Sequence, residues 1–523
     1  MVEKNTEQAI EENFDAVIVG AGNGGLIAAA QMALKGAKIV LCEQHNLPGG
    51  FATSFVRGRF EFEAALHELC DFGPTTNKGA IRKLFEDDMG LNLDFVEIHE
   101  AFRLIINDPN DRLDVVVPFG KEEFIDMMES QVPGSKDSIR NYIRLGEEIT
   151  EAISYITESE GNPEKDVLIS NYKNFLKTAP YTLDQVNNAL KIPKKAQDIL
   201  DAYWCYIGIP TSRINFTFYA AMHYYFLIRN AFIPKYRSHG YTAALESMIR
   251  ENGGKILYNT KVSKIFSENG HVIGVETTQG DTIKANHIIS NASPTLVYNN
   301  LIFPKSEVPK RALKNINARR HAISCFVVYL GLNASAEELG IENYSYHIYD
   351  SVNSEEIYES FKTLNPPKAQ ATICLNKVLS DCSPPDTCIL TITAFFLPEA
   401  WKDVAPEDYF NLKNKIARHL INTFEFATKT SIRDHIEEIE IATPQTLARY
   451  TGTFGGSAYG YETDPWDSFM PRLMELDNER YIKGLEFCGG FSANCQSYTN
   501  ALLSGQIAAF LTLQGLKKMG DSE

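Results

Sequence analysis

Short apolar runs alternate with polar turns at the start of this 523-residue chain. The run "DAVIVG", residues 15–20, is rich in β-branched residues and predicts a buried parallel strand. The next run, "LIAAAQMALK", predicts a helix that ends at Gly36, and "AKIVLCE" predicts a second strand that ends at Glu43. The pattern therefore predicts a strand, a glycine turn, a helix and a second strand in sequence.

The turn between the first strand and the helix carries the glycine pattern of a dinucleotide site. Gly20, Gly22 and Gly25 match G-x-G-x-x-G, which allows a tight turn, the approach of a pyrophosphate and close packing of helix on strand. The free N–H groups and the dipole at the helix N-terminus favour the anion. Glu43 can accept hydrogen bonds from the ribose hydroxyls, and it disfavours the 2′-phosphate of NADP. The sequence therefore predicts a bound dinucleotide.

A second glycine pair favours FAD over NAD. Gly49 and Gly50 follow Glu43 closely, and an acid followed by a glycine doublet is typical of glutathione-reductase-like flavoproteins. A second strand–GxGxxG–helix unit is absent from the sequence, so we expect electrons to pass between the flavin, the substrate and a separate acceptor or donor. The residues predicted to hold FAD are Gly20, Gly22, Asn23, Gly24, Gly25, Glu43, Gln44, Gly49, Gly50, Phe51, Val262, Asn291, Gly489, Gly490 and Thr499.

Later segments complete the predicted fold, which is of the α/β class. Residues 253–294 predict a strand, a hairpin turning at Asn269–Gly270 and a buried strand, and a last helix is predicted from about Tyr498. We expect a glutathione-reductase-like FAD-binding Rossmann domain with an inserted mixed α+β substrate domain. The FAD domain would comprise residues 1–105, 235–300 and 470–523, and the substrate domain residues 106–234 and 301–469.

The segment from Tyr203 to Tyr236 is dense in aromatic residues. A long apolar or conjugated substrate needs a tunnel lined by such side chains. The same pattern suits an aromatic core, and the two interpretations are compatible because the wall of a tunnel is also core on its other side. The sequence therefore predicts an apolar small molecule or lipid as the partner of the substrate domain.

Composition and charge narrow the classes of partner. The net charge of −17 argues against nucleic acid and against docking on an anionic membrane by charge alone. The nine cysteines show no CxxC pair, so no metal site is predicted. The polar N-terminus resembles neither a signal nor a transit peptide, and residues 487–516 carry too many polar groups for a membrane span. We expect a cytoplasmic protein, with peripheral membrane contact possible through the aromatic segment and the oligomeric state left open.

Five segments resemble the family of carotenoid (phytoene) desaturases and carotenoid isomerases, which also contains retinol saturase. They cover the length of the chain in order: "VIVGAGNGGLIAAA…LCEQHNLPGG", "GRFEFEAALHEL", "VPGSKDSI", "SHGYTAALESMIRENGGKI" and "CGGFSANCQSYTNALLSGQIAA". The first and last are shared with flavin amine oxidases. The chain departs from the family in having Phe51 in place of an arginine after the glycine pair, Glu63-Ala64-Ala65 in place of Asp-x-Gly, and "SANCQSY" in the last loop.

The resemblance also suggests the candidates for acid–base chemistry. His67 matches the histidine that follows the family's Phe-x-Phe stretch, although a structural histidine that holds backbone is an alternative. Glu63 is either a structural cap or a contact of the flavin loop, and Tyr498 and Gln496 lie in the loop expected near the flavin. His223 and Arg213 are weaker candidates, for which a surface or capping role is the alternative.

The first functional hypothesis is an FAD-dependent oxidoreductase that desaturates or saturates carbon–carbon bonds of a long isoprenoid, polyene or lipid by hydride exchange with flavin N5. The second is a redox-neutral double-bond isomerase on the same scaffold. An amine oxidase and a non-catalytic lipid-binding escort protein remain as alternatives. The intact glycine pattern and Glu43 weigh against the escort, and the three middle segments weigh against the amine oxidase.

Overall fold

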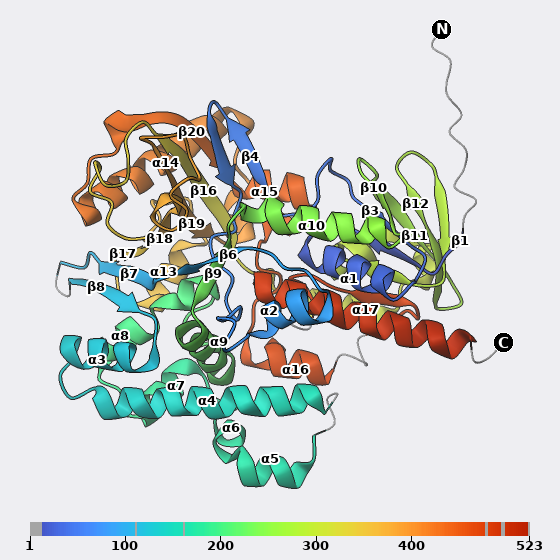
Figure 1. Cartoon of the computed structure of the whole chain (residues 1–523), viewed down its shortest axis with the longest axis horizontal. Helices are drawn as coiled ribbons and strands as arrows, with labels where there is room; N and C mark the ends of the chain where they lie inside the picture. The colour runs from blue at the N-terminus through green and yellow to red at the C-terminus, as the bar shows by residue number, and fades with distance from the viewer. Residues whose placement is uncertain (1–12, 110–111, 160–162, 476–479, 493–496, 521–523) are drawn as a thin grey trace.

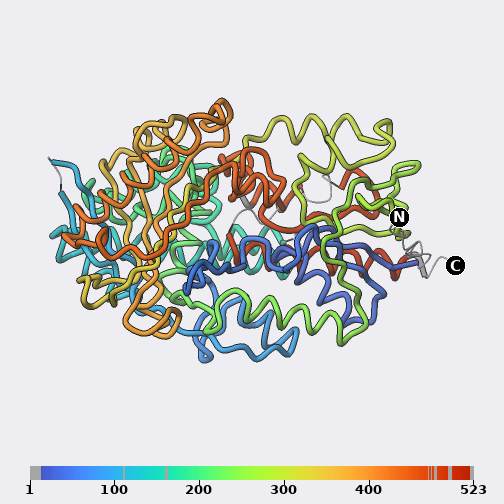
Figure 2. Tube along the Cα trace, turned by 90° about the horizontal axis from the view of Figure 1, so that it is seen from above, coloured from blue at the N-terminus to red at the C-terminus, as the bar shows by residue number. Residues whose placement is uncertain are grey.

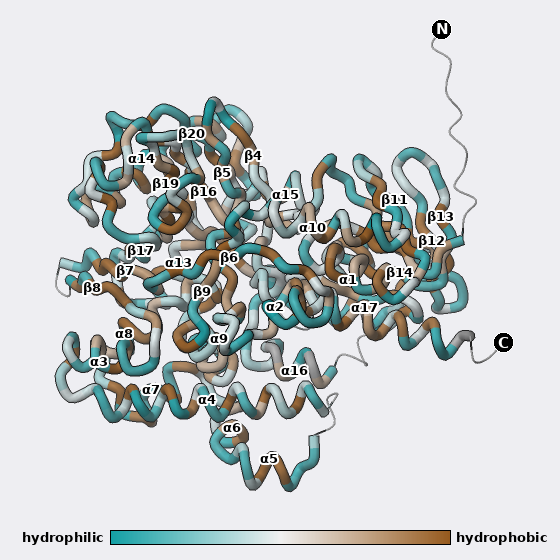
Figure 3. Tube along the Cα trace, in the orientation of Figure 1, coloured by the Kyte–Doolittle hydropathy of each residue, from teal (hydrophilic) through white to brown (hydrophobic). Residues whose placement is uncertain are grey.

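The computed structural model describes residues 13–109, 112–159, 163–475, 480–492 and 497–520. Within these residues the chain forms two sheets at one end of the molecule, a larger sheet at the other end, and a helical region beside the larger sheet (Figure 1). Hydrophobic residues follow the inner strands and the faces of the helices that cover them, while the outer turns are polar (Figure 3). Apolar clusters therefore lie between the sheets and the elements that cover them.

A parallel sheet forms the centre of the first end, as the apolar runs predict. Its strand order is β10-β3-β2-β14-β21, and all neighbours are parallel. Helices α1, α10 and α17 pack together here, so the start, middle and end of the chain lie side by side (Figures 1 and 2). The elements are β2 (Ala16–Val19), α1 (Asn23–Leu34), β3 (Ile39–Cys42), α10 (Arg237–Glu251), β10 (Lys255–Leu257), β14 (Ile288–Ser290), β21 (Leu485–Phe487) and α17 (Tyr498–Gly520).

A second sheet packs beside the parallel one and contains the predicted hairpin. Strands β11 (Val262–Glu268) and β12 (His271–Thr277) are antiparallel, and both turn residues, Asn269 and Gly270, have positive φ. Positive φ at both positions is the geometry that Asn-Gly favours in a two-residue hairpin, so this prediction is confirmed. The remaining strands are β1 (Asn13–Phe14), β13 (Thr282–Ala285) and β15 (Ile302–Phe303).

The larger sheet has the order β20-β16-β19-β18-β17-β7-β8 and is antiparallel except where β17 meets β7. Strand β7 (Glu100–Ile106) belongs to this sheet, although most of it falls in the segment 1–105 of the predicted cofactor domain. Helix α14 (Pro406–Thr428) covers one face of the sheet. The other strands are β8 (Leu113–Pro118), β16 (Ser324–Leu332), β17 (Ser345–Tyr349), β18 (Ala369–Cys374), β19 (Cys388–Phe396) and β20 (Ile436–Ala442).

Helices cover the opposite face of the larger sheet and share one apolar cluster with it. The longest are α3 (Lys121–Gln131), α4 (Lys136–Glu158) and α9 (Phe216–Arg229). Among the described helices, none is both long and apolar enough to cross a bilayer.

Shorter helices occur in several parts of the chain. They are α2 (Ala80–Lys83), α5 (Lys165–Asn171), α6 (Lys173–Thr178), α7 (Leu183–Ala189), α8 (Lys194–Leu200), the 3₁₀ helix η2 (Ala202–Tyr206), α12 (Lys310–Ala318), α13 (Ser354–Ser360), α15 (Pro444–Thr451) and α16 (Phe469–Met474).

Two short two-stranded sheets complete the set, and one of them fixes α10. Strands β4 (Ser54–Arg57) and β5 (Phe60–Glu63) form a hairpin, and β6 (Phe95–Ile98) pairs with β9 (Ala231–Pro234), which lies far from it in sequence. Glu63 ends β5 at the first turn of α10, where the Ser238 N–H donates to Glu63 Oε1 at 3.1 Å and the Ser238 hydroxyl donates to Oε2. A carboxylate here satisfies a free N–H of the helix end. Burial nevertheless raises the pKa of Glu63 to about 7.

The raised pKa of Glu63 predicts a pH-dependent stability. An acid whose pKa is higher in the folded state binds more protons there, so stability falls as pH rises from the unfolded value of 4.5 to about 7. We expect Glu63→Gln, which cannot ionise, to gain melting temperature relative to the wild type across this range. Thermal melting of both proteins at a series of pH values measures the difference. A difference that stays constant with pH would show that Glu63 keeps an ordinary pKa.

Candidate functional site

The glycine turn between β2 and α1 is packed so closely that side chains are excluded. Gly20 has φ +96°, and a Cβ on Gly25 would lie 2.0 Å from the carbonyl oxygen of Gly20. A Cβ on Gly22 would lie 2.3 Å from Nδ2 of Asn291, which follows β14. The turn therefore keeps its backbone exposed toward the space above it, as a pyrophosphate site requires. Gly24 and Gly25 lie behind this surface rather than in it.

Glu43 is fixed at the end of β3 by two backbone N–H groups. Ala21 donates to Oε2 at 2.7 Å, and His45 donates to Oε1 at 2.9 Å. The side chain is buried and its carboxylate lines the cavity next to the glycine turn. The two bonds hold the carboxylate in one orientation, and its remaining lone pairs can accept hydrogen bonds from ribose hydroxyls.

The second glycine pair lies against the first turn. Gly49 has φ +113° and forms an isolated β-bridge with Gly22, and Gly50 has φ +62°. A Cβ on Gly50 would lie 3.2 Å from the Cα of Gly22. Two loops from separate parts of the fold thus form one floor of bare backbone. This floor is a cradle that side chains would fill, which is the feature that a bound dinucleotide needs.

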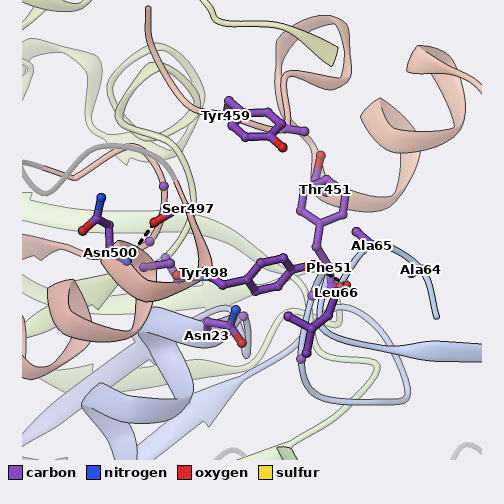
Figure 4. A pocket seen from close by; sticks show the side chains of 18 of the residues that line it. Asn23, Phe51, Ala64, Ala65, Leu66, Thr451, Tyr459, Ser497, Tyr498 and Asn500 are labelled. Carbon is purple, nitrogen blue, oxygen red and sulfur yellow. Dashed lines mark hydrogen bonds between the residues drawn. The ribbon is translucent and has the colours of Figure 1, made fainter. Parts of the chain in front are cut away.

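The start of α17 closes the site from the C-terminal side. The Tyr498 hydroxyl donates to the carbonyl oxygen of Phe51 at 3.1 Å, and the Thr499 hydroxyl donates to that of Cys70 at 2.7 Å. The Gly489 N–H donates to Oγ of Ser504, a residue of α17, at 2.8 Å. Figure 4 shows Asn23, Phe51, Leu66, Tyr459 and Tyr498 around one common space. The segments that the sequence predicted to close the site therefore meet there.

These loops line one continuous cavity of about 1600 Å³. Most ligand sites have volumes of about 300 to 1000 Å³, so this cavity has room for a dinucleotide and a further molecule. The predicted FAD residues that line it are Gly20, Gly22, Asn23, Glu43, Gln44, Gly49, Gly50, Phe51, Val262, Asn291, Gly489, Gly490 and Thr499. The donor set and the bare glycine backbone fit FAD.

The far part of the cavity is lined by the aromatic segment. Residues of this segment belong to the apolar core and also line the cavity, so the tunnel and the aromatic core that the sequence suggested occur together. Side chains from η2, α9 and the larger sheet contribute. The aromatic and apolar lining residues of this part are Tyr203, Tyr206, Ile207, Phe218, Met222, Tyr225, Phe226, Val327, Tyr329, Ile373, Leu375, Ile389 and Tyr459.

The candidate acid–base residues differ in what they contact. His67 lines the cavity, but its Nδ1 lies 2.9 Å from the carbonyl oxygen of Ala65, which favours the structural alternative. Glu63 also lines the cavity and is bound to the start of α10, the cap that was one of its two alternatives. Burial raises the pKa of Tyr498 well above its usual range, so its hydroxyl stays protonated. Gln496 lies outside the described residues.

Two weaker candidates are engaged in the protein interior. His223 is fully buried, its Nδ1 lies 3.2 Å from the Tyr142 hydroxyl, and burial lowers its pKa to about 3. Arg213 donates to Glu462 at 2.7 Å and to Asp464 at 2.9 Å. His223 belongs to internal packing, and the partly exposed Arg213 belongs to an ion pair with Glu462 and Asp464. Gln44 donates from Nε2 to the carbonyl oxygen of Tyr450 at 2.8 Å, which connects the residue after Glu43 to α15.

One polar group of the far cavity was missed by the sequence analysis. Glu68 lines the cavity, and its carboxylate accepts a hydrogen bond from the Tyr203 hydroxyl. Burial raises its pKa. The sequence feature that could have indicated Glu68 is a carboxylate in the mostly apolar stretch "ALHELC", which follows a predicted strand.

Comparisons with known proteins agree with this geometry. Residues 24–383 match the sequence model of the flavin containing amine oxidoreductase family. An all-trans-retinol 13,14-reductase of Danio rerio is 24% identical over 481 residues, which cover 86% of this chain and 78% of the relative. A chloroplastic prolycopene isomerase of Daucus carota is 25% identical and covers 96% of this chain and 81% of its own length. These relatives confirm the resemblance to the retinol saturase and carotenoid isomerase group.

Solved structures share the fold at low sequence identity. An oxidoreductase of Methanosarcina mazei superposes with a TM-score of 0.59 at 16% identity, covering 94% of this chain and 99% of its own. Cyclohexylamine oxidase of Brevibacterium oxydans gives a TM-score of 0.60 at 12% identity, covering 97% and 100%. The predicted fold class is confirmed.

The family match spans more than half of the chain and confirms the predicted flavin cofactor, FAD. The protein is an enzyme of this kind, with relatives that are named as a reductase and an isomerase. The chain belongs to the flavin containing amine oxidoreductase family.

Proposed function

We propose that this enzyme desaturates or saturates a carbon–carbon bond of a long apolar isoprenoid, polyene or lipid. The observation that carries the proposal is the continuity of one cavity from the glycine turns to the aromatic wall. An extended apolar molecule placed along the aromatic part would reach the cofactor part without leaving the protein. The names of the relatives, a retinol reductase and a prolycopene isomerase, point to the same substrate class.

The residues that would hold FAD are the two glycine loops, Glu43 and the loop that begins with Gly489. When bound, FAD accepts or supplies the hydride that a two-electron change at a carbon–carbon bond requires. The chain itself provides an aromatic channel that excludes water and orients an extended substrate. Its candidates for moving the accompanying proton are His67, Tyr498, Gln496 and Glu63.

A redox-neutral double-bond isomerase is the second candidate. It uses the same cavity and is favoured by the similarity to prolycopene isomerase over 96% of this chain. The two activities differ in whether the substrate gains or loses hydrogen atoms. A separate electron acceptor or donor, a peripheral contact with membranes and a cytoplasmic location remain proposals for either activity.

Product analysis distinguishes the two activities. We expect the purified protein to show flavin absorption that bleaches on anaerobic reduction. The reduced protein is then incubated without oxygen with all-trans-retinol or with a poly-cis carotene, and the products are separated and weighed by mass spectrometry. A product heavier by one pair of hydrogen atoms supports saturation, and a product of unchanged mass but new retention time supports isomerisation.

The control is the same incubation with heat-denatured protein and free FAD. A protein that binds flavin but leaves every polyene unchanged, and oxidises simple amines, would replace this proposal with an amine oxidase. A colourless protein that takes up no added FAD would instead support the escort role.

The role of Glu43 predicts the loss of cofactor on its removal. Glu43→Ala deletes the acceptor for ribose and releases the N–H groups of Ala21 and His45. We expect FAD to bind about tenfold more weakly or worse, because hydrogen bonds to a charged group contribute about 1.5–3 kcal/mol each. The flavin-to-protein absorbance ratio after dialysis and a titration with FAD measure the change.

Asp15→Ala is a matched control for this variant. Asp15 immediately precedes β2 of the same sheet, and its Oδ2 accepts a backbone N–H from Lys38 at 2.7 Å. It does not line the cavity. Equal loss of FAD in both variants would show that the sheet, rather than the carboxylate of Glu43, determines binding.

A further inference from the structure

We propose that Glu68, held by Tyr203, is the recognition point for a hydroxyl group on an otherwise apolar substrate. The inference rests on the proposed function and narrows its substrate class to apolar chains that carry a neutral oxygen group. Its basis is the position of one half-buried carboxyl group within the aromatic part of the cavity.

The backbone on both sides of Glu68 is fixed, so the position of its side chain is defined. The carbonyl oxygen of His67 accepts a hydrogen bond from the Tyr344 hydroxyl. On the other side, Leu69 forms an antiparallel bridge with Phe232, in which its N–H donates at 2.8 Å and its carbonyl oxygen accepts at 3.1 Å. A short rigid segment thus presents the carboxyl group to the cavity.

Aromatic rings surround the carboxyl group. Tyr203 donates its hydroxyl to Oε1, and the ring of Tyr206 stacks on that of Tyr203 with centroids 5.0 Å apart. Tyr344 is also close to Glu68, because the pKa of Tyr344 is raised first by burial and then by the charge of Glu68. A carboxyl group in such surroundings is costly unless it is hydrogen-bonded. Tyr203 provides one bond at Oε1, and a substrate hydroxyl in the cavity would provide another.

The surroundings favour a neutral group over a cation. Burial raises the pKa of Glu68, so the folded protein favours the neutral acid more than water does. A neutral carboxyl group can donate to a hydroxyl oxygen or accept from its hydrogen. An ammonium group would need the ionised carboxylate and would lose its own hydration on entering the cavity.

Ligand binding tests the inference without turnover. The FAD-loaded protein is titrated with all-trans-retinol, with the hydrocarbon in which methyl replaces its hydroxymethyl group, and with the corresponding primary amine. Quenching of tryptophan fluorescence gives the dissociation constants, since Trp204 lies in η2 beside Tyr203. We expect the wild type to bind the alcohol about tenfold or more tightly than the hydrocarbon, because a site built around a hydrogen bond rejects an analogue that lacks it.

Three variants assign the preference to Glu68. Glu68→Leu should bind alcohol and hydrocarbon equally, Glu68→Gln should keep most of the preference, and Tyr203→Phe should reduce it. Glu158→Leu is the control, because Glu158 is an exposed acid at the end of α4 that lines another part of the same cavity. It should keep the wild-type preference. Bound FAD absorbance and melting temperature verify that each variant is folded.

The outcomes separate this inference from the proposed function. Equal binding of alcohol and hydrocarbon by the wild type, or an unchanged preference in Glu68→Leu, would contradict the role of Glu68 alone. Tighter binding of the amine than of the alcohol would also overturn it. Failure of the folded, FAD-loaded wild type to bind either polyene would contradict the proposed function, and this inference with it.

Discussion

The close contact of backbone with backbone at the glycine junction is the constraint on which the structure depends. A Cβ on Gly505 of α17 would lie 2.2 Å from the carbonyl oxygen of Gly24 in α1, and one on Gly24 would lie 2.6 Å from the amide nitrogen of Gly489. The first helix, the last helix and the loop before it can therefore approach only because these residues lack side chains. Since the last helix brings Tyr498 and Thr499 to the cavity, one junction positions both ends of the chain around the cofactor.

Asn291 couples this junction to the middle of the chain. Its N–H donates to the carbonyl oxygen of Val19 at 2.9 Å, and its amide side chain lies where Cβ atoms on Gly22 or Gly489 would stand. The residue follows β14, the strand that pairs with both β2 and β21. Three segments that are far apart in sequence thus share one amide group. The two glycine turns and Asn291 act as a unit, because a side chain at any of the glycines would displace the others.

The cofactor half of the site could be predicted from sequence because its signals are local. The turn at Gly20–Gly25, the acid at Glu43 and the hairpin at Asn269–Gly270 each follow from a few neighbouring residues whose backbone geometry limits the choice. The far cavity could be predicted only in part, because the aromatic segment indicated it but its wall combines η2, α9 and strands of the larger sheet. Glu68 and Tyr203 are 135 residues apart, and nothing in either segment specifies that they meet. The sequence also left the role of Glu63 open until its bonds to the start of α10 were seen.

The two halves of the cavity are formed under different physical constraints. Solved oxidoreductases with the same fold, amine oxidases among them, have 12–16% identity to this chain, yet they superpose over nearly its whole length. In this chain the floor of the cofactor half is formed by the backbone of glycines, so it depends on the absence of side chains. The aromatic half is instead a wall made of side chains, in which Glu68 bonds to Tyr203. We therefore infer that side chains such as Glu68 select the substrate of this chain, at the side of the cavity where packing, and not backbone geometry, is the constraint.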